Sequence, residues 1–422
     1  MDFLQKLKLV WSDTVLRKRL LFIGVMLIVF RLLSAIPIPG INIAQLESFL
    51  ANNQFFGLLN IFSGGGLSNL SIVMLGVGPY ITASIIMQLL TMMVPKLKAL
   101  YHEEGEAGRA KFAQYSRLLS VPLSLIQAFG FLVLLSRQGV ITDLSFFSTA
   151  LNVIIVTAGS VLIMWIGEMM TEYGIGNGTS LIIFAGIVAS LPTSLAQLAF
   201  AFDPGQLPMY LGFLALAALI VWGVVVVTAA ERPIPVTYAK RVRGMKVYGG
   251  VSTYLPLRVN QAGVIPIIFA LSIMLFPQMI ATVLSAFDNA VLHAVSSFMT
   301  LIFSNSWVYS SLYFILVLLF TYFYTAITFD PETISNNLQK NGAFIPGVRP
   351  GASTASYISS VVTRITLVGA VFLAVVAVLP LAMQGITGNA SLAIGGTALL
   401  IVVSVVLDFI KKIDAQVSMR EY

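Results

Sequence analysis

The sequence predicts an all-α polytopic membrane protein with ten transmembrane helices, and three observations lead to that prediction. Of its 422 residues, 58% are hydrophobic and only 10% are charged, whereas a soluble domain usually has about 25% charged residues. Apolar windows of roughly 17 to 23 residues recur along the chain, and each is long enough to cross a ~30 Å hydrocarbon core. Basic residues collect in alternate connecting segments, as they do in membrane proteins.

The apolar windows predict the spanning helices, and one further segment precedes them. Residues 1–19 place apolar side chains at helical spacing among basic ones, and no small-residue cleavage site follows. We therefore expect an interfacial helix there rather than a removable signal peptide. The predicted spans are 20–36, 72–94, 115–135, 151–170, 178–196, 208–230, 262–281, 307–327, 362–382 and 392–410.

The distribution of Lys and Arg predicts the orientation of the chain. All 24 of these residues, except Arg31, Arg117, Arg137 and Arg364, fall in the terminal and connecting segments on one side of the predicted membrane. Basic residues near the ends of spans mark the cytoplasmic side. We therefore expect both termini in the cytoplasm.

An even number of spans with both termini on one side allows two halves of five helices, residues 1–200 and 201–422. Because five is odd, the second half would enter the membrane upside down relative to the first. Inverted halves of this kind place a pathway at the interface between them, here a central pore. No convincing internal sequence repeat is visible, so this prediction depends on topology alone.

Residues 60–94 predict a discontinuous element, a short half-helix followed by a full helix. Glycine and serine interrupt its first half, and glycine lowers helix stability by about 1 kcal/mol relative to alanine. Because unpaired backbone is costly in lipid, this half either lines a protein-enclosed pathway or forms an apolar external loop. The residues leave both interpretations open. Similarly, Arg31 either extends to the outer interface or faces a cavity.

Two long internal loops are longer than orientation requires. Residues 231–261 alternate apolar side chains around a basic tip and predict a β-like hairpin that projects from the membrane. Residues 328–361 contain the turn sequence FIPGVRPG. Both loops are explained either by the general excess of positive charge on the inner side or by a docking surface for an acidic or nucleic-acid partner.

The sequence contains no recognisable catalytic or metal-binding set. There is no cysteine, and the two histidines, His102 and His293, are predicted on opposite sides of the membrane. No Asp or Glu lies at the centre of a predicted span, which disfavours an ion-coupled carrier, because such carriers use an intramembrane carboxylate. We expect no enzyme, no metal and no cofactor. A secondary transporter of a small solute remains the alternative, and a membrane-embedded enzyme is less favoured.

Seven motifs carry a resemblance to one family. They are RLLSAIPIPGI at 31–41, MLGVGPYITASIIMQLL at 74–90, GEAGR at 105–109, YGIGNGTSLIIFAGI at 173–187, LPLRVNQAGVIP at 255–266, IPGVRPG at 345–351 and GGTALLIVV at 395–403. In number, order and spacing they resemble the SecY family, the channel subunits of the bacterial protein-conducting translocon, over essentially the whole chain. The resemblance implies a plasma-membrane channel that passes unfolded secretory polypeptides and releases hydrophobic segments sideways into lipid. The implied partners are SecE, SecG, the SecA motor ATPase, the ribosome, signal-sequence-bearing polypeptides and membrane lipids.

The resemblance also implies a seal made of two parts. Its plug corresponds to Phe62, Ser63, Gly64, Gly65, Gly66, Leu67, Ser68, Asn69 and Leu70. Its apolar pore ring corresponds to Val77, Ile81, Thr179, Ile183, Ile268 and Ile401. Thr179 departs from the apolar residue usual in the family. A narrow apolar ring can exclude ions by dewetting.

Two further sets of residues follow from the resemblance. In this family the second, third, seventh and eighth helices form a lateral gate, where Thr82, Gln88, Gln127 and Asn260 would supply breakable polar contacts. The docking surface for SecA and the ribosome would include Lys240, Arg241, Arg243, Lys246 and Arg349.

Overall fold

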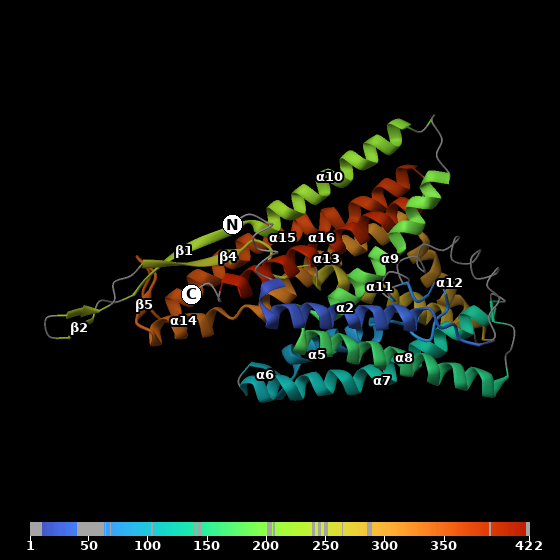
Figure 1. Cartoon of the computed structure of the whole chain (residues 1–422), viewed down its shortest axis with the longest axis horizontal. Helices are drawn as coiled ribbons and strands as arrows, with labels where there is room; N and C mark the ends of the chain where they lie inside the picture. Colours follow the sequence, from blue (N-terminus) through green and yellow to red (C-terminus); the bar gives the residue numbers. More distant parts are fainter. Residues whose placement is uncertain are drawn as a thin grey trace.

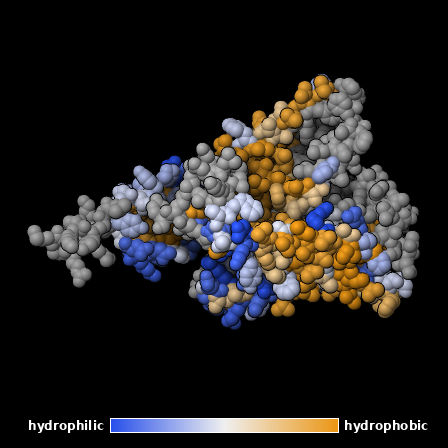
Figure 2. Space-filling model, viewed as in Figure 1, coloured by the Kyte–Doolittle hydropathy of each residue, from blue (hydrophilic) through white to orange (hydrophobic). Residues whose placement is uncertain are grey.

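The computed structural model shows a bundle of long helices with a small sheet projecting from one end (Figure 1). It describes residues 11–39, 63, 65–67, 69–102, 104–137, 140–141, 145–200, 205, 207–238, 241–243, 246–248, 252–263, 265–284, 289–387 and 390–418. On the viewed face, apolar residues cover the helices and hydrophilic residues gather toward the end with the sheet (Figure 2).

Each of the ten predicted spans overlaps one long helix, in the predicted order, and the fold class is confirmed. These helices are α2 (Thr14–Ser34), α5 (Gly78–Met93), α7 (Gly105–Arg137), α8 (Phe146–Tyr173), α9 (Gly178–Phe200), α10 (Leu207–Ala229), α11 (Ile265–Leu284), α13 (Ser306–Thr328), α15 (Ala352–Thr387) and α16 (Ala390–Ser418). Three shorter helices were not predicted: α6 (Pro95–His102), α12 (Ala290–Ser304) and α14 (Pro331–Lys340).

Length and hydropathy alone identify fewer spans among the described residues. Four helical stretches are long and apolar enough to cross a membrane, or five if α5 and α6, which meet at a bend of 113°, count as one. Shorter apolar segments lie in α9, α10 and α11. In α2, basic residues at both ends of the apolar run reduce its hydropathy.

The start of α5 corrects a predicted boundary. We expected this span from residue 72, but the helix begins at Gly78. Residues 72–77 form consecutive turns instead, with hydrogen bonds from Met74 N to Ser71 O and from Gly76 N to Val73 O. Gly76 has a φ of 53°, a left-handed conformation that glycine adopts readily and that interrupts a helix.

The glycine-rich stretch before α5 also differs from the prediction. Its described residues, Ser63, 65–67 and 69–70, lie in turns rather than in a short half-helix. Phe62, Gly64 and Ser68 lie outside the described residues. Backbone hydrogen bonds from Ile38 N to Leu70 O and from Ile72 N to Ile36 O attach this stretch to the chain that follows α2.

The predicted β-hairpin is present, and it belongs to a larger sheet than expected. Strand β1 (Glu231–Tyr238) pairs antiparallel with β4 (Ser252–Arg258), and β2 (Arg241–Arg243) pairs with β3 (Lys246–Tyr248) beyond them. The second internal loop adds β5 (Ala343–Phe344) to the free edge of β1. Apolar residues of β1, β4 and the β5 region pack with α15 in one buried cluster, so the two loops form a single projecting unit.

The first five long helices contact the last five along two lines. On one, α11 packs against α5 and α7. On the other, α16 packs against α9. The largest buried apolar cluster draws its members from both sets of helices, so the core of the molecule lies between them.

Candidate functional site

The structure brings five of the six predicted ring residues into this largest buried cluster. Their exposed fractions are 0% for Val77, 7% for Ile81, 1% for Ile183, 5% for Ile268 and 1% for Ile401. They come from the start of α5 and from α9, α11 and α16. Four segments distant in sequence thus contribute to one apolar core, and we call these five residues the ring cluster.

Thr179 is the exception, and its hydroxyl has a local role. Thr179 Oγ1 donates a hydrogen bond to Asn177 Oδ1 (2.6 Å), which also accepts from the backbone N–H of Thr179 (3.0 Å) and Ser180 (3.3 Å). Asn177 therefore caps the start of α9. Thr179 is half-buried and lines one cavity together with the ring residues Ile81, Ile183 and Ile268.

Two glycines of α8 and α9 position the ring helices by allowing close backbone contact. A Cβ on Gly159 of α8 would lie 2.0 Å from Ile72 O, and a Cβ on Gly178 of α9 would lie 2.0 Å from Gly167 O. Next to Gly159, Ser160 Oγ donates to Gly76 O (3.0 Å). Because no side chain fits at these two crossings, α8 holds both the entry to α5 and the start of α9 at a fixed separation.

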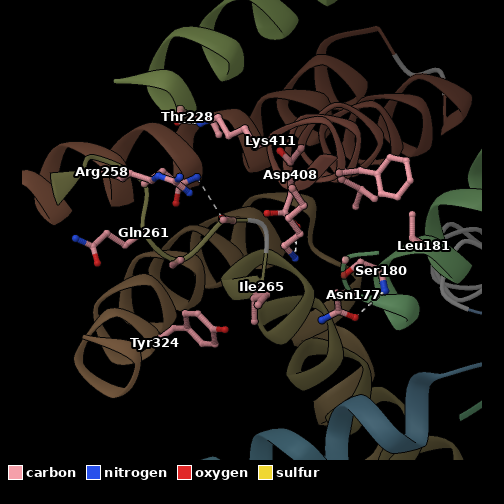
Figure 3. Close-up of a pocket in the computed structure, with 18 residues that line it drawn as sticks. Asn177, Ser180, Leu181, Thr228, Arg258, Gln261, Ile265, Tyr324, Asp408 and Lys411 are labelled. Carbon is pink, nitrogen blue, oxygen red and sulfur yellow. Dashed lines mark hydrogen bonds and ion pairs between the residues drawn. The ribbon is translucent and has the colours of Figure 1, made fainter. Parts of the chain in front are cut away.

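A polar vestibule adjoins the ring cluster. One cavity of about 400 Å³ is lined by the ring residues Ile81, Ile183 and Ile268 and also by polar side chains, including Ser84, Gln88 and Arg117. A second cavity of about 310 Å³ (Figure 3) leads on toward the end of β4. The two cavities share four lining residues, Asn177, Ser180, Ile265 and Tyr324. We call them together the vestibule.

An ion pair and a partly buried lysine connect helices around the vestibule. Arg117 Nε of α7 lies 2.6 Å from Glu168 Oε1 of α8. In Figure 3, Lys411 of α16 points toward Thr228 of α10, to whose carbonyl its Nζ donates (2.7 Å). Lys411 follows the apolar part of α16, and burial, then the nearby Arg258 guanidinium, lowers its pKa. The vestibule is thus lined by both signs of charge.

The described residues of the predicted plug lie in a different apolar cluster from the ring cluster. Leu67 and Leu70 are fully buried in a second apolar cluster, which includes Phe131 of α7 and Val156 of α8. On α7, Phe131 lies 14 residues beyond Arg117 of the vestibule, or about 21 Å along the helix. The vestibule and the glycine-rich loop therefore occupy opposite ends of the same helices.

Arg31, whose surroundings the sequence left open, lies against the glycine-rich loop. Its Nη1 is 3.3 Å from the position that a Cβ on Gly65 would occupy. Asn69 Nδ2 of the loop also donates to Ser34 O at the end of α2 (3.5 Å). The end of α2 is therefore one wall of the site that holds the loop.

The predicted gate helices meet, but the predicted polar side chains bond locally. Thr82 Oγ1 donates to Gly78 O (3.0 Å), Gln88 Nε2 to Ser84 Oγ (3.2 Å) and Asn260 Nδ2 to Gly263 O (3.3 Å). Such partners within one helix or turn are always in reach, whereas a bond between helices needs a particular register. Gln127 is buried on α7. Among the described residues, Gln88 Oε1 and Asn260 Oδ1 are buried without a hydrogen-bond partner.

The predicted docking residues lie on the projecting unit. Arg349 is exposed in the turn after β5, where Thr354 Oγ1 donates to Arg349 O (2.9 Å) and where Gly347 and Gly351 have φ values of 82° and 98°. Arg241, Arg243 and Lys246 lie in β2 and β3, and their side chains are outside the described part of the structure, as is Lys240 altogether.

Sequence reasoning missed the Arg117–Glu168 pair. Both residues were visible near the inner ends of adjacent predicted spans, so opposite charge at similar depth was the available signal. The close approaches at Gly159 and Gly178 carried no comparable signal, because many glycines in the chain face open space, as Gly24 and Gly212 do.

Comparison with known proteins decides the family. A family model described as SecY matches residues 71–410, most of the chain. The chain belongs to the SecY family. It is 42% identical to the protein translocase subunit SecY of Corynebacterium glutamicum, an alignment that covers 98% of this chain and 97% of that protein. The corresponding subunit of Streptomyces coelicolor is 41% identical, with 96% of each chain covered.

Solved structures share the fold of this SecY-family chain. A structure of a protein-conducting channel superposes with a TM-score of 0.64 at 19% identity, covering 94% of this chain and 91% of that one. A SecY structure, reported in connection with a plug domain that stabilises the closed state of its translocation channel, gives a TM-score of 0.65 at 19% identity, with the same coverage. Sec61 in the canine ribosome–channel complex gives 0.60 at 18% identity, again covering 94% and 91%.

Proposed function

We propose that this chain is the channel-forming subunit of a protein translocase in a bacterial plasma membrane. It passes unfolded secretory polypeptides across the membrane and releases hydrophobic segments sideways into lipid. The observation that carries the proposal is the convergence of Val77, Ile81, Ile183, Ile268 and Ile401 on one apolar core between a polar vestibule and a glycine-rich loop. The names of the relatives and the family of the chain support the same function.

The ring cluster would act as the seal. A narrow collar of Val and Ile side chains resists wetting, so that ions cross it poorly. A polypeptide would enter through the vestibule, whose polar walls accommodate a hydrated chain, and would push the aliphatic side chains apart. These side chains offer no strong hydrogen bond to hold a passing segment.

The glycine-rich loop at 62–70 would act as the plug beyond the ring. Its described turns carry few large side chains, so little beyond Leu67 and Leu70 holds it in the second apolar cluster. Local backbone contacts of this kind open at a lower free energy than a packed helix does. Displacement of the loop would complete the aqueous path.

The lateral gate would open where α11 meets α5 and α7. This line of contact separates the proposed halves, 1–200 and 201–422, which would be inserted in opposite orientations. Gln88 Oε1 and Asn260 Oδ1, buried and unpartnered among the described residues, would gain water or chain partners as the vestibule widens. When the gate opens, α11 would lose apolar contacts with α5 and α7, and a hydrophobic signal sequence bound between these helices would supply new ones.

Both termini would lie in the cytoplasm, together with the vestibule and the projecting sheet. SecE and SecG would complete the complex, and SecA or the ribosome would dock on the projecting unit that carries Lys240, Arg241, Arg243, Lys246 and Arg349. The pairing of β1 with β5 supports this assignment because it joins the two basic loops into one surface. Arg offers bidentate contacts to carboxylates that Lys cannot match. The chain itself would carry out no chemistry.

Reconstitution tests the function. The chain is placed in liposomes with SecE and SecG, and SecA, ATP and a secretory polypeptide are added outside. We expect the polypeptide to become protected from protease, and Arg349→Glu to reduce both this protection and the stimulation of SecA ATPase while the complex still assembles. Uptake of a small solute without polypeptide protection would favour the secondary transporter and contradict the proposal.

A further inference from the structure

Helix α12 (Ala290–Ser304) is an element that the sequence placed in an external loop and that the proposed conduction does not use. It connects α11 and α13 at the end of the molecule opposite the sheet (Figure 1). Its 15 residues would extend about 22 Å, too short to cross a ~30 Å hydrocarbon core. The helix therefore has to end within the membrane region or at its surface.

Asparagine residues set both ends of α12. Asn289 Oδ1 accepts a hydrogen bond from Val291 N (3.0 Å), and Asn305 Oδ1 accepts one from Trp307 N at the start of α13 (3.1 Å). Each is an N-cap, so α12 and α13 begin at defined residues and the chain changes direction between them. A third contact fixes α12 on its neighbour: Ser296 Oγ, which is buried, donates to Ala281 O of α11 (2.8 Å).

The opposite side of α12 is apolar and exposed. Val291, Val295, Phe298 and Leu301 have exposed fractions of 69%, 43%, 66% and 70%. Their spacing of three and four residues places them on one face of the helix. The helix contains no Asp, Glu, Lys or Arg. Large contiguous apolar surface of this kind is unfavourable in water.

A separate face of α12 is polar. His293, Ser297 and Thr300 are exposed there. Two of the hydroxyls are already satisfied by the helix, because Ser297 Oγ donates to His293 O and Thr300 Oγ1 to Ser296 O (2.8 and 2.9 Å). The helix thus has three sides, one packed on protein, one apolar and one polar, which is the pattern of a helix at a lipid–water boundary.

The two helices that α12 connects also carry exposed apolar side chains near it. Trp307 and Val308, at the start of the spanning helix α13, are 76% and 43% exposed, and Ile280 of α11 is 39% exposed. Tryptophan is enriched where spans meet the membrane interface. Because Trp307 follows closely after the end of α12, its position supports a place for α12 near that interface.

We propose that α12 is an amphipathic anchor embedded in the outer leaflet of the lipid bilayer, with Val291, Val295, Phe298 and Leu301 among the acyl chains. Through Ser296 and the two asparagine caps, it ties the outer end of the gate helix α11 to the lipid. A change in the lipid packing of the outer leaflet would then move α12 and, through it, the outer end of α11. The lipid contact itself does not depend on what passes through the channel, whereas the choice of leaflet and the link to the gate rest on the proposed function.

Spin labels test this directly, since the chain has no cysteine of its own. Single cysteines at Val295 and Phe298 are labelled in liposomes, with Ser297 and Thr300 as matched controls on the polar face of the same helix. We expect the labels at 295 and 298 to collide more often with oxygen than with a water-soluble nickel complex, and those at 297 and 300 to show the reverse. Equal nickel access at all four positions would overturn the proposal, as would protection from both reagents, which would mean that protein covers the face.

A second measurement needs no label. Phe298→Asp should lower the melting temperature of the protein in liposomes by more than Ser297→Asp does, because only the first places a carboxylate among acyl chains. Both positions are exposed, so neither substitution disturbs a buried contact. Equal shifts in the two variants would contradict the anchor.

Discussion

The ring cluster and the glycine-rich loop are both buried, yet they are built in opposite ways. The ring collects single side chains from helices far apart in sequence, each fixed by a regular backbone. The loop is local: its described residues lie in successive turns with positive φ at Gly65 and Leu70, and Leu70 O accepts a backbone hydrogen bond from Ile38 N. A barrier made of side chains opens when the helices that carry them move apart. A barrier made of turns opens when the whole loop segment moves out of its site.

This difference implies different sensitivities. The position of the ring side chains depends on the spacing that α8 sets between α5 and α9. A substitution at these close contacts would therefore displace a whole helix. The loop depends on a few contacts with α2, α7 and α8 and tolerates change until one of these is lost. The variants below separate the two parts, from the largest expected effect to the smallest.

The close approaches of α8 should give the largest effect. Gly159→Ala and Gly178→Ala each place a Cβ about 2.0 Å from a backbone oxygen, so we expect a loss of more than about 2 kcal/mol in the free energy of unfolding. Gly24→Ala and Gly212→Ala are matched controls, because their added Cβ meets nothing within 4 Å. Unfolding in detergent measures all four, and equal stability of test and control variants would contradict the described helix spacing.

Polar substitution of the ring should act next, on conductance. Ile183→Asn with Ile268→Asn should wet the apolar core, raise resting ion leak in planar bilayers and relax the need for a strongly apolar signal sequence. Ile183→Val with Ile268→Val keeps the core apolar and serves as the control. A leak that stays at the unmodified level in the Asn variant, with the protein folded, would mean that the seal lies elsewhere.

Deletion of residues 62–70 should affect the loop without the ring. We expect a folded protein with a larger resting leak than the unmodified channel, but a smaller leak than that of the Asn ring variant, since the apolar collar remains. Single-channel recording compares the two. An unchanged conductance after deletion would count against the loop as a plug.

Thr179 offers a finer distinction. Because its hydroxyl bonds to the capping Asn177, Thr179→Val should cost about 1 kcal/mol of stability and leave ion leak unchanged. Thr179→Ile, which adds apolar volume beside the ring, should if anything tighten the resting channel. An increase of leak in both variants would show that the hydroxyl belongs to the seal.

The ion pair at the vestibule end should give the smallest effect. The Arg117 and Glu168 side chains are 45% and 16% exposed, so Glu168→Gln should cost only about 0.2–1 kcal/mol, and less at high salt. The exchange Arg117→Glu with Glu168→Arg should restore stability. A double-mutant cycle measures the coupling energy, and additive effects of the two single changes would mean that the Arg117–Glu168 pair does not stabilise the contact between α7 and α8.

Much of the fold was readable from hydropathy and charge, because a lipid-facing helix must be long and apolar. The same reasoning missed α12, whose apolar run is too short to count as a span. It also started α5 too early, since hydropathy does not register the left-handed glycine at 76.

The site was predicted less completely than the fold. Motif resemblance selected Val77, Ile81, Ile183, Ile268 and Ile401, and the structure gathers these five in one cluster. Gln88 and Asn260 were predicted to bond between helices, but they bond to the nearby Ser84 and Gly263. The position of Arg31 against the glycine-rich loop depends on rotation and depth between distant helices, which no local pattern encodes.

The central claim is that a translocating polypeptide passes through the ring cluster. Single cysteines at Ile183, Ile268 and Ile401, in a chain that has none of its own, can be cross-linked to one cysteine in a secretory polypeptide arrested during passage. Leu219→Cys on α10, where the residue is 62% exposed, is the control. We predict disulfides to the three ring positions and none to position 219. Efficient translocation with no cross-link at the ring, or with cross-links at position 219 alone, would contradict the claim.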